Sequence, residues 1–84
     1  MRYQCKCCEY FSLPEESVGN DNICPICFWH DDFVQQNDPD FEGGANKESL
    51  NQARMNYHNF GAVNKASLRF VRKPTEEEQP MNNV

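Results

Sequence analysis

The clearest hydrophobic periodicity lies in the second half of the chain. Apolar residues recur there at intervals of three and four, at Leu50, Ala53, Tyr57 and Phe60. This spacing places one apolar stripe on a helix. Asn46 is a typical N-cap residue, and Gly61 directly after the stripe is a typical helix stop. The pattern predicts a main helix from about Asn46 to Phe60.

A helix of this length is only marginally stable alone, so the stripe must pack on another surface. We expect that surface to be the aromatic cluster Phe28, Trp29 and Phe33. A second short helix is expected to start near Asn64, with Leu68 and Val71 facing inward and Pro74 ending it.

The first third of the chain has shorter elements. Residues 2–5, 9–13 and 17–23 are predicted to form brief β-type stretches that are separated by turn-forming residues. Residues 37–44 (NDPDFEGG) are expected to form an irregular loop. Residues 74–84 lack apolar periodicity and are expected to form a flexible acidic tail. One domain over residues 1–73 is the resulting prediction.

Composition limits what such a domain can bury. Ile, Leu, Val and Phe make up only 16 of the 84 residues, and the formal net charge is −5. The mean hydropathy is −0.87 and the pI is about 4.8. Chains of this composition approach the border of disorder, because apolar burial cannot offset the entropy of ordering. Something besides a hydrophobic core must hold the fold together.

The cysteines supply that element. Cys5 and Cys8 form C-x2-C, fifteen residues follow, and Cys24 and Cys27 form a second C-x2-C. This spacing is typical of four-cysteine zinc sites, in which each tight turn directs two thiolates at one ion. The sequence therefore predicts a small α+β metal-stapled domain. Its N-terminal part is expected to be zinc-ribbon or zinc-knuckle-like, and Cys5, Cys8, Cys24 and Cys27 are its predicted zinc ligands.

Other interpretations of the cysteines stay open. Tetrahedral thiolates suit iron as well as zinc. A redox C-x2-C of thioredoxin type needs a βαβ pattern that the chain does not offer, and a disulfide framework is disfavoured by the odd cysteine count. Cys7 is expected to pack as a small hydrophobic residue, with a ligand or reactive-thiol role as the alternative. His30 is expected to be an ordinary packing or surface residue.

Charge is unevenly distributed along the chain. Residues 9–48 carry ten acidic groups and one basic group, whereas residues 49–73 carry five basic groups and no acidic one. A nucleic-acid-binding protein usually has a basic face and a high pI, so nucleic acid is an unlikely partner. The acidic half favours a basic protein partner instead.

Several classes of function are disfavoured by missing motifs. The sequence has no apolar run long enough for a membrane span, and no apolar stretch of a secretory signal follows Arg2, so we expect a cytoplasmic protein. The expected fourfold thiolate coordination leaves no open metal position, and no nucleophile–base pair is apparent, so we expect no enzymatic activity. The adjacent Asp31 and Asp32 are expected to bind backbone N–H groups rather than a substrate or second metal.

Four stretches of the sequence together resemble a known family. CKCC, ICPICFWHDD, GGANKESLNQARMNYHNFGA and VRKPTEEE occur in this order over residues 5 to about 78, and they are similar to the small cysteine-rich CPCC proteins of bacteria. Lys6 stands where that family has the proline of its C-P-C-C motif, and His30 stands where it has glutamate. The resemblance speaks further against His30 as a ligand. Small proteins of this kind occur beside bacterial toxin genes, so the resemblance leads us to expect an immunity role.

We therefore expect a non-enzymatic zinc-binding interaction module, most specifically an immunity protein that binds a basic toxin such as a nuclease effector. A thiol or redox protein and a nucleic-acid-binding zinc ribbon are the alternatives. The ribbon would use Arg54, Lys65, Arg69, Arg72 and Lys73. The residues expected to contact a basic partner are Glu15, Glu16, Asp21, Asp31, Asp32, Asp38, Asp40, Phe41 and Glu42.

Overall fold

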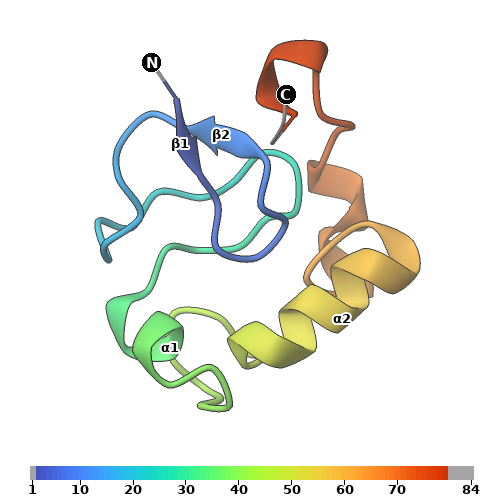
Figure 1. Cartoon of the computed structure of the whole chain (residues 1–84). Coiled ribbons are helices and arrows are strands. Elements are labelled where there is room, and N and C mark those ends of the chain that lie inside the picture. The colour runs from blue at the N-terminus through green and yellow to red at the C-terminus, as the bar shows by residue number, and fades with distance from the viewer. Residues whose placement is uncertain (1, 80–84) are drawn as a thin grey trace.

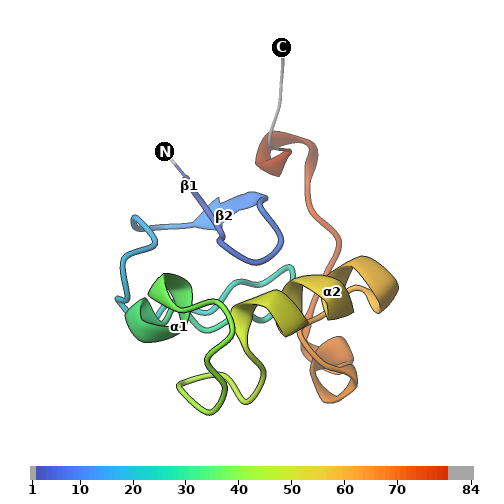
Figure 2. The same cartoon turned by 60° about the horizontal axis from the view of Figure 1, so that its bottom comes forward.

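The computed structural model describes residues 2–79. Its elements in chain order are β1 (Tyr3–Gln4), β2 (Phe11–Leu13), α1 (Phe33–Asn37), α2 (Leu50–Phe60), and the two 3-10 helices η1 (Lys65–Phe70) and η2 (Glu76–Glu78) (Figure 1). The two strands lie at the opposite end of the molecule from α1 and α2, and the chain around residues 20–30 passes between them (Figures 1 and 2).

The strands form a small antiparallel sheet in which Tyr3 is opposite Leu13. The third predicted stretch, residues 17–23, is not a strand, and only Ile23 forms an isolated bridge, with His30. Gly19 and Asp21 have positive φ values of 95° and 64°, which turn the chain back on itself. The structure is therefore a small α+β fold, and the more specific zinc-ribbon assignment stays a prediction.

Helix α1 lies just before the loop that the sequence predicts at residues 37–44. The Asp32 side chain caps it by accepting a hydrogen bond of 3.0 Å from the Gln35 N–H. Five residues are too few to leave a helical periodicity in the sequence. Phe33 begins this helix and is 62 % exposed, so it does not receive the α2 stripe as expected.

Helix α2 begins later than predicted. Its N-cap is Ser49, whose hydroxyl accepts from the Gln52 N–H at 3.1 Å. Asn46 is buried three residues earlier, and its side chain binds other loops instead. The predicted stop is confirmed, because Gly61 adopts the left-handed conformation with φ of 97°.

The core is built around the cysteines. Leu50 and Ala53 of α2 pack into the same buried cluster as Trp29, one of the three aromatic residues expected to receive the stripe, and Phe28 packs partly buried against this cluster. The full set of buried residues in this cluster is Cys5, Cys7, Leu13, Cys24, Ile26, Cys27, Trp29, Leu50, Ala53 and Val63. Half of its members are cysteine or alanine, which explains why a chain with few large apolar residues needs additional stabilisation.

The C-terminal part differs from the sequence-based prediction. The second short helix is η1, a 3-10 helix capped by Asn64, but Leu68 is exposed rather than inward. Residues 75–79 were expected to belong to a flexible tail, yet Glu76–Glu78 form η2, and Glu78 is fully buried. The bidentate pairing of Glu78 with Arg72 accounts for this difference. Residues 80–84 of the predicted tail lie outside the described residues.

Candidate metal centre

Each C-x2-C segment forms a tight turn, and the two turns share one bonding pattern. In the first, the Cys5 N–H donates to the Tyr10 carbonyl and the Glu9 N–H donates to the Cys5 carbonyl, both at 3.0 Å. In the second, Cys24 makes the same two bonds with Trp29 at 3.0 Å and with Phe28 at 2.8 Å. The two cysteine turns are therefore local repeats of each other.

The repeat explains why the Cys7 side chain is buried. The N–H groups of Cys7 and Ile26, each two residues after the first cysteine of its turn, donate to the Cys5 and Cys24 Sγ atoms at 3.4 Å. Both side chains are buried, Cys7 at 5 % and Ile26 at 1 % exposure. Cys7 thus occupies the position of a core hydrophobic residue, as expected from its small apolar side chain.

Both turns also require a residue in the left-handed region. Glu9 and Phe28 are the fourth residues after Cys5 and Cys24, and their φ values are 70° and 74°. Glycine adopts such angles most easily, and neither position is glycine. The sequence therefore gives no local signal for these two conformations, and only the cysteine spacing indicates the turns.

The two turns bring the four predicted ligand residues together. The Sγ atoms of Cys5, Cys8, Cys24 and Cys27 all lie within 4.8 Å of one another, and these cysteines form no disulfide. Cys5 and Cys27 Sγ are 3.6 Å apart, and Cys8 and Cys24 Sγ are 3.7 Å apart. Four sulfurs about 2.3 Å from a central ion would be separated by roughly 3.8 Å. The cluster therefore fits a tetrahedral metal ion.

Further donors surround the sulfurs. The Trp29 N–H donates to Cys27 Sγ at 3.4 Å, and the Ser12 hydroxyl lies 3.0 Å from Cys24 Sγ. Hydrogen bonding from Cys27 lowers the pKa of Cys24, whereas burial raises the pKa of Cys27. Metal ligation requires the sulfurs as thiolates, and a dication would stabilise four thiolates that lie so close together.

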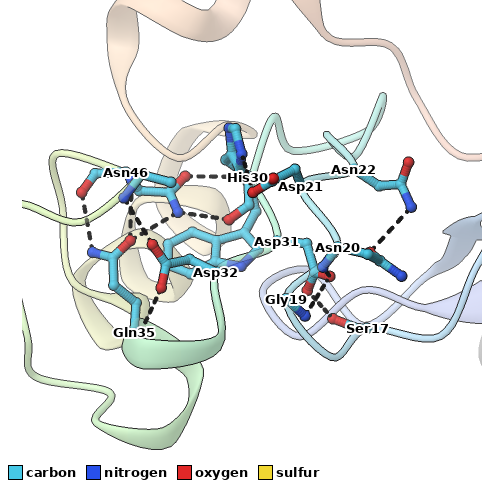
Figure 3. A network of polar contacts seen from close by, with 12 residues as sticks. Ser17, Gly19, Asn20, Asp21, Asn22, His30, Asp31, Asp32, Gln35 and Asn46 are labelled. Carbon is cyan, nitrogen blue, oxygen red and sulfur yellow. Dashed lines mark hydrogen bonds and ion pairs between the residues drawn. The ribbon is translucent and has the colours of Figure 1, made fainter.

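His30, Asp31 and Asp32 were not expected to bind the metal, and they lie outside the four-cysteine cluster. His30 Nε2 is 3.2 Å from an Asp21 carboxylate oxygen. Asp31 is buried and accepts hydrogen bonds from the Gly19 and Asn20 N–H groups, both at 2.9 Å (Figure 3). Asp32 accepts from the Gln35 N–H and, at 2.8 Å, from the Ala45 N–H. These bonds confirm that the Asp pair binds backbone groups.

The same bonds correct part of the expected partner-binding set. Asp31 cannot contact a partner because only 1 % of it is exposed. Asp32 is half-buried, and hydrogen bonds to backbone N–H groups hold its pKa below the usual range. The other predicted contact residues are exposed, namely Glu15, Glu16, Asp21, Asp38, Asp40, Phe41 and Glu42.

Figure 3 shows a polar network that includes His30, Asp31, Asp32, Gln35 and Asn46, and sequence reasoning missed its centre. The fully buried Gln35 side chain donates to the carbonyls of Phe41, Asn46 and Glu48 and accepts from the Asn46 N–H at 3.0 Å. The Asn46 amide also donates to the His30 carbonyl at 2.7 Å (Figure 3). A Gln and an Asn in polar segments carry no pattern that indicates burial, so only the three-dimensional arrangement reveals them.

Fold and site together define a small cysteine-rich protein with a four-cysteine cluster suited to a metal ion. The chain belongs to the cysteine-rich CPCC family, whose model matches residues 3–78. The sequence-based resemblance is thereby confirmed. None of the curated proteins matches the chain. Within residues 2–79, no helix is long and apolar enough to cross a membrane.

Proposed function

We propose that this chain is a non-enzymatic zinc protein whose folded surface binds a basic protein partner. The observation that carries the zinc assignment is the group of four Sγ atoms within 4.8 Å of one another. Four thiolates complete a tetrahedral shell, so no coordination position is left for a substrate. The ion would have a structural role, which suits a chain with so little apolar core.

Iron would use the same four sulfurs, so the metal needs a direct measurement. Metal analysis of the purified protein should give one zinc per chain and negligible iron. An iron-loaded protein with visible thiolate-to-iron absorption would contradict the zinc assignment. A protein without any metal, purified under reducing conditions with intact thiols, would contradict the metal-binding function itself.

The partner surface that we propose combines charge with exposed apolar side chains. Val18, Phe33 and Val34 are each more than half exposed. Val18 precedes Gly19, at which a Cβ atom would lie only 2.6 Å from the Phe33 Cβ, so these segments are in contact. The exposed acidic residues come from the same segments and the adjoining loop: Glu15, Glu16, Asp21, Asp38, Asp40 and Glu42.

A surface of this kind favours a basic partner. Apolar residues such as Phe33 would supply the buried contact, and the surrounding carboxylates would steer a positively charged protein and determine specificity. The family resemblance favours an immunity protein as the specific form, with a basic bacterial toxin such as a nuclease effector as the partner.

Co-expression with the product of the neighbouring gene, followed by copurification, tests the partner. The variant Glu15→Lys/Glu16→Lys should weaken binding and reduce its salt dependence. Glu76→Lys/Glu77→Lys makes the same change in charge at the exposed residues of η2 and is the matched control. If both variants lost binding equally, this surface would be contradicted. If no complex with a basic protein formed at low salt, the proposed partner class would be contradicted.

Two alternatives have weaker support. A thiol or redox role for Cys7 is disfavoured by its burial, and counting reactive thiols in the metal-loaded protein would test it. A nucleic-acid-binding role would use the basic residues of the second half, but Arg72 is engaged by Glu78 and the Arg54 Nε–H donates to the Lys6 carbonyl. Binding to DNA or RNA in a mobility-shift assay at low salt would revive this alternative.

A further inference from the structure

The four sulfurs of the cluster differ in their exposure. Cys5, Cys24 and Cys27 are fully buried, each with 0 % of the residue exposed. Cys8 is only partly buried. A reagent in solution can therefore approach one sulfur of the centre far more easily than the other three.

The sulfurs also differ in their hydrogen bonds. Cys5 Sγ accepts from the Cys7 N–H, and Cys27 Sγ accepts from the Trp29 N–H. Cys24 Sγ accepts from the Ile26 N–H and lies beside the Ser12 hydroxyl. Among residues 2–79, no amide or hydroxyl donor bonds to Cys8 Sγ. Because hydrogen bonds withdraw electron density from a thiolate, Cys8 keeps the most nucleophilic sulfur of the four.

The exposed side of Cys8 opens into a hollow of about 400 Å³. Tyr10 and Tyr57, packed edge to face with ring centroids 6.3 Å apart, contribute to its wall. Arg54 and His58 line it as well. The hollow is large enough for a small molecule to reach the sulfur without any change in the fold.

We infer that Cys8 is the position at which small electrophiles attack the metal centre. In this reaction the Cys8 thiolate forms an S–C bond with an alkyl halide, and the halide leaves with the electron pair of the broken C–X bond. The product is a neutral thioether, which is a much poorer ligand than a thiolate. Modification at Cys8 would therefore release the metal and unfold the domain, which makes the protein sensitive to electrophiles at one defined residue.

This inference rests on the metal centre of the proposed function but not on its protein partner. The test uses the purified metal-loaded protein and iodoacetamide in limiting amount. Alkylated residues are mapped by mass spectrometry, and metal release is followed with a chromogenic chelator. We expect Cys8 to react first and one metal ion to be released for each Cys8 alkylated. The advantage over Cys5 should be at least about tenfold in rate, equivalent to roughly 1.4 kcal/mol.

Two sets of variants make the test specific. Cys7→Ala leaves the four ligands intact and should alkylate at the wild-type rate. His58→Trp should fill the hollow and slow the reaction, whereas His58→Ala should not, and both should keep the metal.

First alkylation at Cys7, equal alkylation of all five cysteines, or metal release before any alkylation would each overturn the inference. The proposed function would survive these results, because the metal content is measured before the reagent is added. If the purified protein contained no metal, that result would contradict both the inference and the proposed metal-binding function.

Discussion

The buried carboxylate of Glu78 makes the C-terminal segment part of the fold. It accepts hydrogen bonds from Arg72 Nη1 and Nη2 at 2.9 and 2.8 Å and from the Thr75 N–H at 2.8 Å. Arg2 Nη1 lies 3.7 Å from one of the Glu78 carboxylate oxygens. Hydrogen bonding from Arg72 lowers the pKa of Glu78 from 4.5 to about 2. We predict that Glu78→Gln destabilises the whole domain.

The size of the effect follows from that pKa. One pKa step corresponds to about 1.4 kcal/mol, so the full change would be worth about 3 kcal/mol. The Arg72 side chain is 45 % exposed, so solvent weakens the pair. We therefore expect Glu78→Gln to lower the free energy of unfolding by about 2 kcal/mol. Because the pKa is lower in the folded state, this stabilisation is complete above about pH 4.5 and is lost as the pH falls towards 2.

Guanidinium unfolding of the metal-loaded protein at about pH 7, followed by circular dichroism, measures this loss. Glu77→Gln is the matched control, because Glu77 is exposed in the same 3-10 helix, and it should change stability by less than about 0.5 kcal/mol. The difference between wild type and Glu78→Gln should stay constant between about pH 6 and pH 8. Equal stability of Glu78→Gln and Glu77→Gln would refute the assignment of Glu78 as an anchor.

Three further predictions concern the centre and its supports. Removing the metal with a strong chelator should unfold the domain, since coordination contributes about 10–16 kcal/mol in small zinc peptides. An unchanged circular dichroism spectrum after confirmed metal loss would contradict this prediction. Cys24→Ser should abolish metal binding while Cys7→Ser keeps it, as measured by metal stoichiometry. Gly44→Ala should cost about 1–3 kcal/mol in unfolding experiments, because the added Cβ would lie 2.8 Å from an Asp32 oxygen. Gly43→Ala has open space and should cost only about 1 kcal/mol, from its positive φ.

The sequence predicts those parts of the structure that depend on fixed local spacing. The C-x2-C pairs indicate the four sulfurs that meet, and Gly61 marks the end of α2. The start of α2 is a different case, because Asn46 and Ser49 are both good N-caps. The choice is made by distant groups, since the Asn46 amide binds the His30 carbonyl and leaves the cap to Ser49.

Glu78 had one local signal, the T-x-x-E spacing of a capping box with Thr75, but that spacing does not indicate burial. It is one of three consecutive glutamates, and the composition of that run is typical of a solvated tail. Its neighbours Glu76 and Glu77 are indeed exposed. Two contacts distinguish Glu78 from them: Arg72, six residues earlier in the chain, lies 2.8 Å away in space, and the Thr75 N–H donates to the Glu78 carboxylate in a capping box.

The polar network links the metal centre to the proposed partner surface. Asp31 holds the turn at Gly19 and Asn20, while Asp32 caps α1, so two of the ten acidic residues between 9 and 48 act inside the protein. Both follow directly from the second cysteine turn, whose Trp29 donates to Cys27 Sγ. Loss of the metal would therefore break the hydrogen bonds of Asp31 and Asp32, and the turn at Gly19 and Asn20 would no longer be held next to α1. If a basic partner binds at the proposed surface, binding should thus require the metal, although that surface contains none of the four cysteines.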